Sequence, residues 1–259
     1  MARLIFLGTG AALPTAGRGN TALAISGQPA SDWLLIDCGG DVFRALLRAN
    51  IPIDGVRDLL ITHAHIDHIG ALPSLIESFR IGGRKAPLRI WALPEVLAIV
   101  HRLLDLYGYE LTLESWPYAI TYHEAHAGGD VTLAGIATHI EAMDHALPTL
   151  GLRLDLPGGP VCYTCDTQPT PAVPRLAHDV AWLITECTFL DRDRAFARRS
   201  KHTTAREAGE QATAAGARKL ALVHLGEGDG WPAADARTEA ATMFDGEILI
   251  PEDGQSLEV

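Results

Sequence analysis

One stretch of seven residues, Thr62-His63-Ala64-His65-Ile66-Asp67-His68, constrains the fold of this chain more than any other. It follows the apolar run Leu59-Leu60-Ile61, which predicts a buried strand. It leads into Ile69-Gly70-Ala71-Leu72-Pro73, which predicts the opening of a helix. The polar cluster is therefore expected on a strand-to-helix turn, where side chains from one short segment can converge.

Four side chains of this stretch are potential metal ligands. His63 and His65 are two residues apart, so in an extended chain they point the same way. The following turn can bring Asp67 and His68 back beside them. Imidazole suits zinc, iron, nickel or copper, and a carboxylate can help to hold a second ion next to the first. Three unrelated loop histidines are the alternative, but 11 histidines among 259 residues rarely gather in one turn by chance.

Length and cysteine content narrow the class of protein. A chain of 259 residues can bury a core without covalent staples. No stretch approaches about 20 uninterrupted apolar residues, so we expect no membrane span. Residues 1–7 predict a first strand rather than a secretory signal, because Gly8-Thr9-Gly10 interrupts the apolar run early. The four cysteines are too few and too scattered for a disulfide framework, which predicts a cytoplasmic protein.

Net charge bears on the partners. The formal charge of −11 repels polyanions, so broad, sequence-independent binding of nucleic acid is disfavoured. Two basic segments, 80–89 and 192–201, could still recruit a phosphate locally. Solvated surface faces are the alternative for both segments, and we favour that interpretation for the first.

The order of apolar runs predicts the fold class. Strands come first, and strands and helices then alternate, which indicates two β-sheets packed face to face with helices outside. We find no linker of low complexity and therefore expect one domain over residues 1–259. The predicted strands are 4–7, 21–25, 33–36, 58–61, 88–91, several within 118–156, 160–164, 181–186, 219–224, 247–250 and 256–259, and the predicted helices are 41–49, 73–79, 94–107, 171–177, 204–215 and 233–244.

The motif His63-x-His65-x-Asp67-His68 resembles the signature of the metallo-β-lactamase superfamily. Phe6-Leu7-Gly8-Thr9-Gly10, together with residues 62–73, is similar to its ribonuclease Z branch. The resemblance covers nearly the whole chain and implies a four-layer αββα sandwich. It also implies two divalent metal ions, with zinc expected and manganese or iron as alternatives, and a homodimer.

The resemblance implies a complete ligand set. His145 matches the third imidazole by its His-x5-Gly spacing, Asp166 matches a bridging carboxylate, and His224 matches the last ligand. His123, His126 and His139 match no motif, and we set them aside. The implied first metal is held by His63, His65 and His145, the second by Asp67, His68 and His224, with Asp166 between them. Such a pair could share a hydroxide that attacks an anionic ester.

Two neighbours of these ligands leave alternatives open. Asp37 could cap helix 41–49, or it could orient a ligand histidine as the family's pattern suggests. Cys165 stands where the family usually has the glycine of Gly-Asp-Thr. A packed, reduced thiol is favoured there over a soft ligand, and the single pair Cys162-x2-Cys165 is weak support for structural zinc.

A glutamate and a histidine resemble the catalytic pair of ribonuclease Z. They are Glu186, in Thr185-Glu186-Cys187, and His202, in Lys201-His202-Thr203-Thr204. In this interpretation Glu186 orients His202, which acts as general acid to a leaving alkoxide, and Asp67 completes the predicted catalytic set. The alternative, a simple threonine cap for helix 204–215, explains neither the glutamate nor the histidine.

One part of the ribonuclease Z pattern is missing. Members that cut tRNA precursors carry a long Gly/Pro-rich arm between the third-ligand histidine and the bridging aspartate, but only 20 residues separate His145 from Asp166 here. The predicted substrate is therefore a small phosphodiester, such as a cyclic or short nucleotide. The alternatives are hydrolysis of a lactone, thioester or aryl sulfate at the same metals, and tRNA 3′ processing despite the missing arm. Flavin-linked di-iron chemistry is disfavoured, because that branch generally has a carboxylate where His65 stands.

Overall fold

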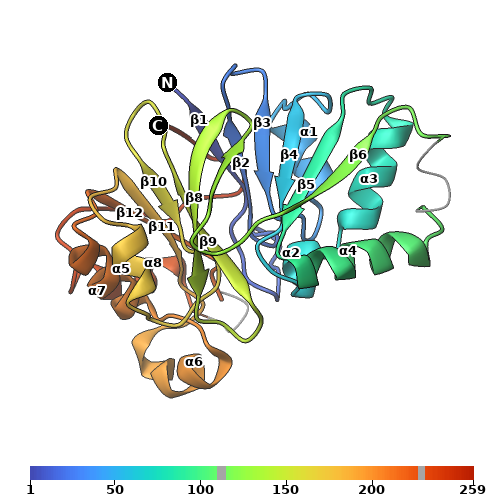
Figure 1. Cartoon of the computed structure of the whole chain (residues 1–259). Coiled ribbons are helices and arrows are strands. Elements are labelled where there is room, and N and C mark those ends of the chain that lie inside the picture. The colour runs from blue at the N-terminus through green and yellow to red at the C-terminus, as the bar shows by residue number, and fades with distance from the viewer. Residues whose placement is uncertain (110–114, 227–230) are drawn as a thin grey trace.

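The computed structural model describes residues 1–109, 115–226 and 231–259. Within them two seven-stranded sheets face each other, and helices cover both outer faces (Figure 1). The predicted αββα sandwich is thereby confirmed. The two ends of the chain lie together, since Ala2 N donates to Val259 O at 2.8 Å.

The first sheet contains the first six strands of the chain and the last one. Its spatial order is β14-β1-β2-β3-β4-β5-β6. From β3 onward the neighbouring strands are parallel. The strands are β1 (Arg3–Gly8), β2 (Ala22–Ser26), β3 (Trp33–Ile36), β4 (Val56–Leu60), β5 (Leu88–Ala92), β6 (Ile120–Glu124) and β14 (Ser256–Glu258).

The second sheet repeats this design, with the order β13-β12-β11-β10-β9-β8-β7. Strands β10 to β13 are parallel, and the hairpins of β7 to β10 are antiparallel. The strands are β7 (Asp130–Leu133), β8 (Ile136–Met143), β9 (Thr149–Leu154), β10 (Val161–Tyr163), β11 (Trp182–Glu186), β12 (Lys219–Val223) and β13 (Glu247–Leu249).

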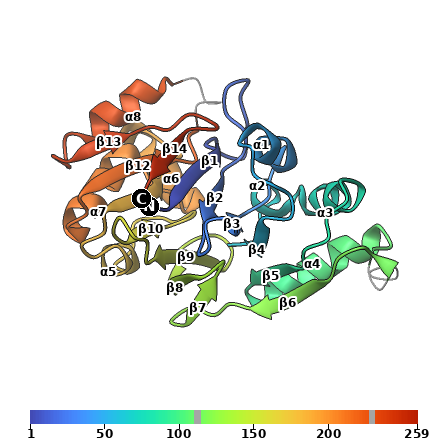
Figure 2. The ribbon, with the colours of Figure 1, turned by 90° about the horizontal axis from the view of Figure 1, so that it is seen from above.

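Most of the helices bury the faces of the sheets that point away from each other. Figure 2 shows one group of helices on the side of the first sheet and another on the side of the second. The helices are α1 (Val42–Arg48), α2 (Ile66–Ile69), α3 (Leu72–Ile81) and α4 (Pro94–Leu106) in the first half, and α5 (Ala172–Leu176), α6 (Arg194–Ser200), α7 (Ala205–Ala215) and α8 (Ala233–Ala240) in the second. No described helix is long and apolar enough to cross a membrane.

The central strands are buried along their whole length because both faces are covered. All four residues of β3 and all five of β11 are buried, as expected of parallel strands between two layers. Phe6 and Ile36 of the first sheet meet Leu152 and Tyr163 of the second in the core between the sheets. Two further apolar clusters fill the spaces between each sheet and its helices.

Two short helices differ from the sequence-based expectations. Asp67 and His68 lie within α2, whereas we expected them on a turn before a helix; the carbonyl of His65 already accepts hydrogen bonds from the N–H groups of His68 and Ile69. Helix α6 was not predicted, because its sequence Arg-Ala-Phe-Ala-Arg-Arg-Ser has no apolar periodicity beyond a single buried alanine. Both helices end beside residues of the candidate site.

Candidate metal centre

The candidate ligands follow strand ends at one edge of the sandwich. His63 and His65 come after β4, His145 after β8, Asp166 after β10 and His224 directly after β12. β8 runs in the same direction as β10, because both are antiparallel to β9. The carboxyl ends of parallel strands form a common edge, where open α/β sheets bind their ligands.

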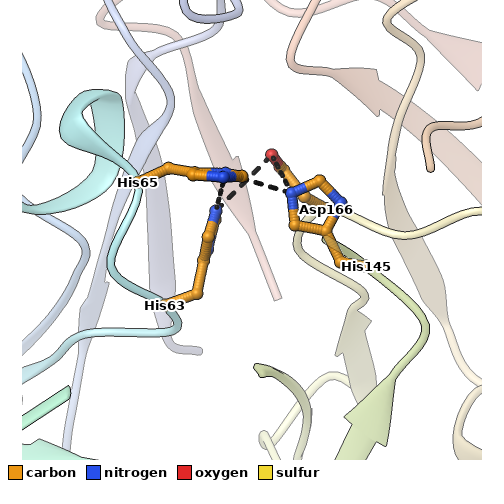
Figure 3. A group of neighbouring side chains, drawn as sticks. All are labelled: His63, His65, His145 and Asp166. Carbon is orange, nitrogen blue, oxygen red and sulfur yellow. Dashed lines mark hydrogen bonds and ion pairs between the residues drawn. The ribbon is translucent and has the colours of Figure 1, made fainter. Parts of the chain in front are cut away.

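Four of these side chains form a first group (Figure 3). Nδ1 of His65 lies 3.0 Å from Nε2 of His63 and 3.1 Å from Nε2 of His145. Oδ2 of Asp166 lies 3.7 Å from each of these two Nε2 atoms. The structure therefore brings together three nitrogens and one carboxylate oxygen from three separate parts of the chain.

A second group lies next to the first and shares its aspartate. Oδ2 of Asp67 is 3.5 Å from Nε2 of His68 and 3.3 Å from Nε2 of His224. Oδ2 of Asp166 lies 3.5 Å from the first of these nitrogens and 3.3 Å from the second. One carboxylate oxygen thus reaches both groups, which is the position expected for a bridging ligand.

Outer hydrogen bonds direct the ring nitrogens into this centre. Nδ1 of His145 donates to the carbonyl oxygen of Lys201 at 2.9 Å, so its Nε2 carries a lone pair. Nδ1 of His68 lies 2.8 Å from Oδ2 of Asp37, and Nδ1 of His63 lies 3.1 Å from Oγ1 of Thr62. The Lys201 carbonyl and the Asp37 carboxylate are acceptors of the kind that usually hold metal-binding histidines, and the Thr62 hydroxyl places a third oxygen beside His63.

The donor set fits divalent cations. Nδ1 of His65 and the Nε2 atoms of His63 and His145 cannot all be satisfied by one another, because Nδ1 of His65 has either one hydrogen or one lone pair to share between the other two. Among the buried side-chain atoms without any hydrogen-bond partner are Nε2 of His68 and Oδ1 of Asp166. Unpaired polar atoms at this depth are costly unless they coordinate an ion.

The pKa values favour the ligand forms of most of these groups. Burial, followed by the charge of His68, lowers the pKa of His63 to about 2. Burial raises the pKa of Asp67, but the hydrogen bond from His224 and the charge of His68 outweigh it and lower the pKa to about 2. His68 differs: burial lowers its pKa, yet the facing carboxylates of Asp166 and Asp37 raise it well above the usual value. The positive charge of His68 balances the carboxylates of Asp166 and Asp37, a role that a bound cation would otherwise fill.

Glu186 and His202 form a pair at the border of the centre. The buried Glu186 carboxylate accepts from the N–H of Thr167 at 2.6 Å and from the N–H of Thr203 at 3.1 Å. Its oxygens lie 2.9 and 3.0 Å from Nδ1 of His202. Burial lowers the pKa of His202, but the Glu186 carboxylate outweighs it and raises the pKa to about 9.

His202 also contacts the candidate ligands directly. Its ring stacks on His224 with 5.4 Å between centroids and meets His145 edge-on at 4.9 Å. The threonine cap that we considered as an alternative does exist: Thr204 and Glu207 form a capping box at the start of α7. The cap involves neither Glu186 nor His202, so it does not account for their pairing.

The geometry bears on several of the sequence-based alternatives. Asp37 does not cap the helix that follows it, since the residue before α1 is Asp41 and makes no side-chain cap. Cys165 lies beside the first group: its Sγ is 3.6 Å from Nδ1 of His63, not from the Nε2 that faces His65, and it is close enough to His63 and His68 for the three to form a further possible ligand group. Of the histidines that we set aside, His139 pairs with the carboxylate of Asp130.

The basic segments also have defined partners. A solvated face is the wrong interpretation at Arg84, which is fully buried and donates to the backbone carbonyls of Ile53, Val56 and Pro87. Its three acceptors lie just before β4, at the start of β4 and just before β5. In the second segment Arg192, Arg194, Arg198 and Lys201 all pair with carboxylates, namely those of Asp193, Asp191, Glu207 and Asp144.

Two residues of the site were missed by sequence reasoning. Oγ1 of Thr188 lies 2.9 Å from Nδ1 of His224 and donates to Glu186 at 2.7 Å. The carbonyl of Lys201 holds His145, as described above. A backbone acceptor leaves no sequence signal, whereas Thr188 lies two residues after Glu186 and could have been noticed as its neighbour.

Comparisons with known proteins identify the family and the fold of the chain. The family model described as the β-lactamase superfamily domain matches residues 32–225. Ribonuclease Z of Halorubrum lacusprofundi is 30% identical over 303 aligned residues, covering 99% of this chain and 97% of the relative. The metallo-β-lactamase fold protein YhfI from Bacillus subtilis superposes with a TM-score of 0.84 at 22% identity, covering 99% of this chain and 98% of the other. The short form of human tRNase Z gives 0.80 at 21%, with the same coverage.

The chain therefore belongs to the metallo-β-lactamase superfamily, in its ribonuclease Z-like branch. It is a metal-dependent hydrolase of the phosphodiester-cleaving type.

Proposed function

We propose that this protein is a two-metal phosphodiesterase acting on a small phosphodiester, such as a cyclic nucleotide or a short oligonucleotide. The observation that carries the proposal is the His202–Glu186 pair beside the His/Asp cluster. A proton donor at that position serves a reaction with a poor leaving group. Nδ1 of His202 is occupied by Glu186 at 2.9 Å, so the other ring nitrogen remains for the substrate.

In this proposal each residue has a defined task. His63, His65 and His145 would hold one cation and Asp67, His68 and His224 the other, and Asp166 could serve both groups. When bound, two divalent cations supply Lewis-acid charge that lowers the pKa of water and neutralises the phosphodiester oxygens. Nε2 of His202 then gives its proton to the leaving alkoxide, while Glu186 keeps the ring oriented.

The short connection between β9 and β10 favours the proposal of a small substrate. β9 ends at Leu154 and β10 begins at Val161, so a short turn stands where a tRNA-gripping arm would be inserted. The cations of segment 192–201 are mostly neutralised by neighbouring carboxylates, and the chain carries a net charge of −11. A long polyanion would therefore gain little from this surface.

A second candidate is tRNA 3′ processing. It is favoured by the relative named ribonuclease Z and by the likeness in fold to human tRNase Z. The same residues would perform the chemistry, and the two candidates differ only in how the substrate is held.

The identity of the metal, the assembly and the location are further parts of the proposal. We propose zinc as the native metal, because five of the seven ligand candidates are imidazoles and zinc favours nitrogen ligands. We also propose one domain over residues 1–259, a homodimer as implied by the family resemblance, and a cytoplasmic location, which suits four buried free thiols.

The test uses the metal-loaded protein and substrates that differ in their leaving group. One panel contains bis(p-nitrophenyl) phosphate, cyclic nucleotides, a dinucleotide and a tRNA precursor, and a second contains a lactone, a thioester and an aryl sulfate. We expect turnover in the first panel, with small diesters preferred over the tRNA precursor. Turnover confined to the second panel would refute the proposal.

The general acid is tested with His202→Ala. For an alkoxide leaving group we expect kcat to fall by roughly 10²- to 10⁴-fold at unchanged metal content. The loss should be much smaller with p-nitrophenolate, which needs no proton to depart. His139→Ala, at an exposed histidine paired with Asp130, is the matched control. An equal loss for both leaving groups would contradict the assignment.

A further inference from the structure

The hydroxyl of Thr62 lies between three groups that surround the centre. Oγ1 is 2.9 and 3.0 Å from the two oxygens of Asp37, 3.1 Å from Nδ1 of His63 and 2.9 Å from Sγ of Cys165. Each of these four residues has an exposed fraction of at most 1%. Solvent therefore does not compete with the hydrogen bonds among these four side chains.

The protons at this junction can be assigned from what each group is able to donate. A threonine hydroxyl has one hydrogen, and a carboxylate only accepts, so the hydrogen of Thr62 goes to Asp37. The lone pairs of Oγ1 then accept from Nδ1–H of His63 and from the thiol of Cys165. Because Nδ1 of His63 carries the hydrogen, its Nε2 keeps a lone pair directed toward His65 and Asp166.

We propose that Thr62 is a positioning residue for His63, and that the Cys165 thiol supports it as a second donor to the same oxygen. The inference rests on the proposed metal-binding role of His63. It extends that role to the Thr62 hydroxyl and the Cys165 thiol, which lie at Nδ1 of His63 rather than at the Nε2 that faces His65.

Asp37 connects the two candidate metal groups through this junction. Its Oδ2 lies 2.8 Å from Nδ1 of His68, a ligand candidate of the second group. Its Oδ1 accepts from the backbone N–H of Thr62 at 2.8 Å. One carboxylate thus orients a histidine of the second group directly and a histidine of the first group only by way of the Thr62 hydroxyl.

This arrangement predicts that the two metals respond differently to one substitution. Thr62→Val keeps the shape of the side chain and the backbone N–H but removes the hydroxyl. Nδ1 of His63 then loses its acceptor, while Asp37 still holds His68. Asp37→Asn, in contrast, disturbs both histidines.

The experiment measures the affinity of each of the two zinc equivalents by competition with a chelator, for the whole protein and its variants. For Thr62→Val we expect the Kd of one equivalent to rise by roughly 10- to 100-fold, the usual cost of losing an outer partner of a metal ligand. The other equivalent should change by less than about threefold, whereas Asp37→Asn should weaken both.

Companion variants separate the hydroxyl from general packing. Thr62→Ser restores the oxygen and should recover most of the affinity. Cys165→Ser keeps a donor and should resemble the natural protein, and Cys165→Ala should weaken the same equivalent as Thr62→Val, but by less. Thr138→Val removes another buried threonine hydroxyl, which bonds to Ile136 O at 3.2 Å, and serves as the control with unchanged affinities.

A spectroscopic readout does not depend on any variant folding. ¹⁵N NMR of histidine-labelled, zinc-loaded protein should assign His63 as the tautomer protonated at Nδ1. The opposite tautomer would overturn the proposal, as would unchanged metal affinities in Thr62→Val or an equal loss of both equivalents. Metal binding is measured without substrate. The role of Thr62 can therefore be judged even if the protein proves not to be a phosphodiesterase.

Discussion

Replacement of Glu186 by glutamine tests the site more sharply than removal of a ligand, because it changes one oxygen to an NH2 group and little else. The buried carboxylate accepts from the N–H groups of Thr167 and Thr203, from the hydroxyl of Thr188 and from the His202 ring. Neither of the two backbone N–H groups can act as a hydrogen-bond acceptor. The glutamine NH2 must therefore face at least one of them in either orientation.

The magnitude follows from that conflict. One orientation leaves the N–H of Thr167 without an acceptor, and the other leaves the N–H of Thr203 without one. A buried donor left unpaired costs about 1–3 kcal/mol, so we expect Glu186→Gln to lower the free energy of unfolding by about that amount. Loss of the carboxylate also leaves His202 without its charged partner. We expect kcat for an alkoxide leaving group to fall by roughly 10²- to 10⁴-fold.

The assay combines urea unfolding of the metal-loaded protein with turnover of substrates that have good and poor leaving groups. Glu124→Gln provides a matched control, because Glu124 also pairs with a histidine, His126, at 2.9 Å but at the exposed surface. An exposed pair of this kind contributes about 0–1 kcal/mol. Should Glu186→Gln and Glu124→Gln behave alike in both measurements, the reasoning about this buried pair is wrong.

Two further predictions concern the metals and the frame that holds them. Removal of the metals by a chelator should lower Tm, since a ligand present at 100 times its Kd stabilises the folded state by about 2.7 kcal/mol. Thermal unfolding with and without added zinc measures this shift. An unchanged Tm would contradict tight metal binding. Asp58→Ala should lower the free energy of unfolding by about 3–5 kcal/mol, because the buried carboxylate of β4 holds Arg89, Trp91 and the N–H of Ala134. The metal content of the Asp58→Ala variant should stay unchanged. Loss of the metals from a variant that is still folded would contradict this, because the substitution would then also disturb the metal centre.

Local pattern in the sequence was sufficient for the elements and for one part of the site. The apolar runs predicted the strands because a strand between two layers is largely apolar on both faces: β3 is Trp-Leu-Leu-Ile, and β11 begins Trp-Leu-Ile. The stretch containing His63, His65 and Asp67 is contiguous, so the spacing alone indicated convergent ligands. Short elements such as α6 escaped prediction, since seven residues with one buried alanine carry no periodic signal.

Only the tertiary structure decided what surrounds those ligands. His145, Asp166 and His224 are far apart in the chain, and strand order and register bring them to one edge, which no local pattern specifies. The direction of the Cys165 thiol and the burial of Arg84 depend on neighbours that the chain supplies only after folding. The residue types that could bind metal were thus determined by the sequence itself. Which nitrogen faces the centre depends on hydrogen-bond partners, such as the carbonyl of Lys201, that packing alone brings into place.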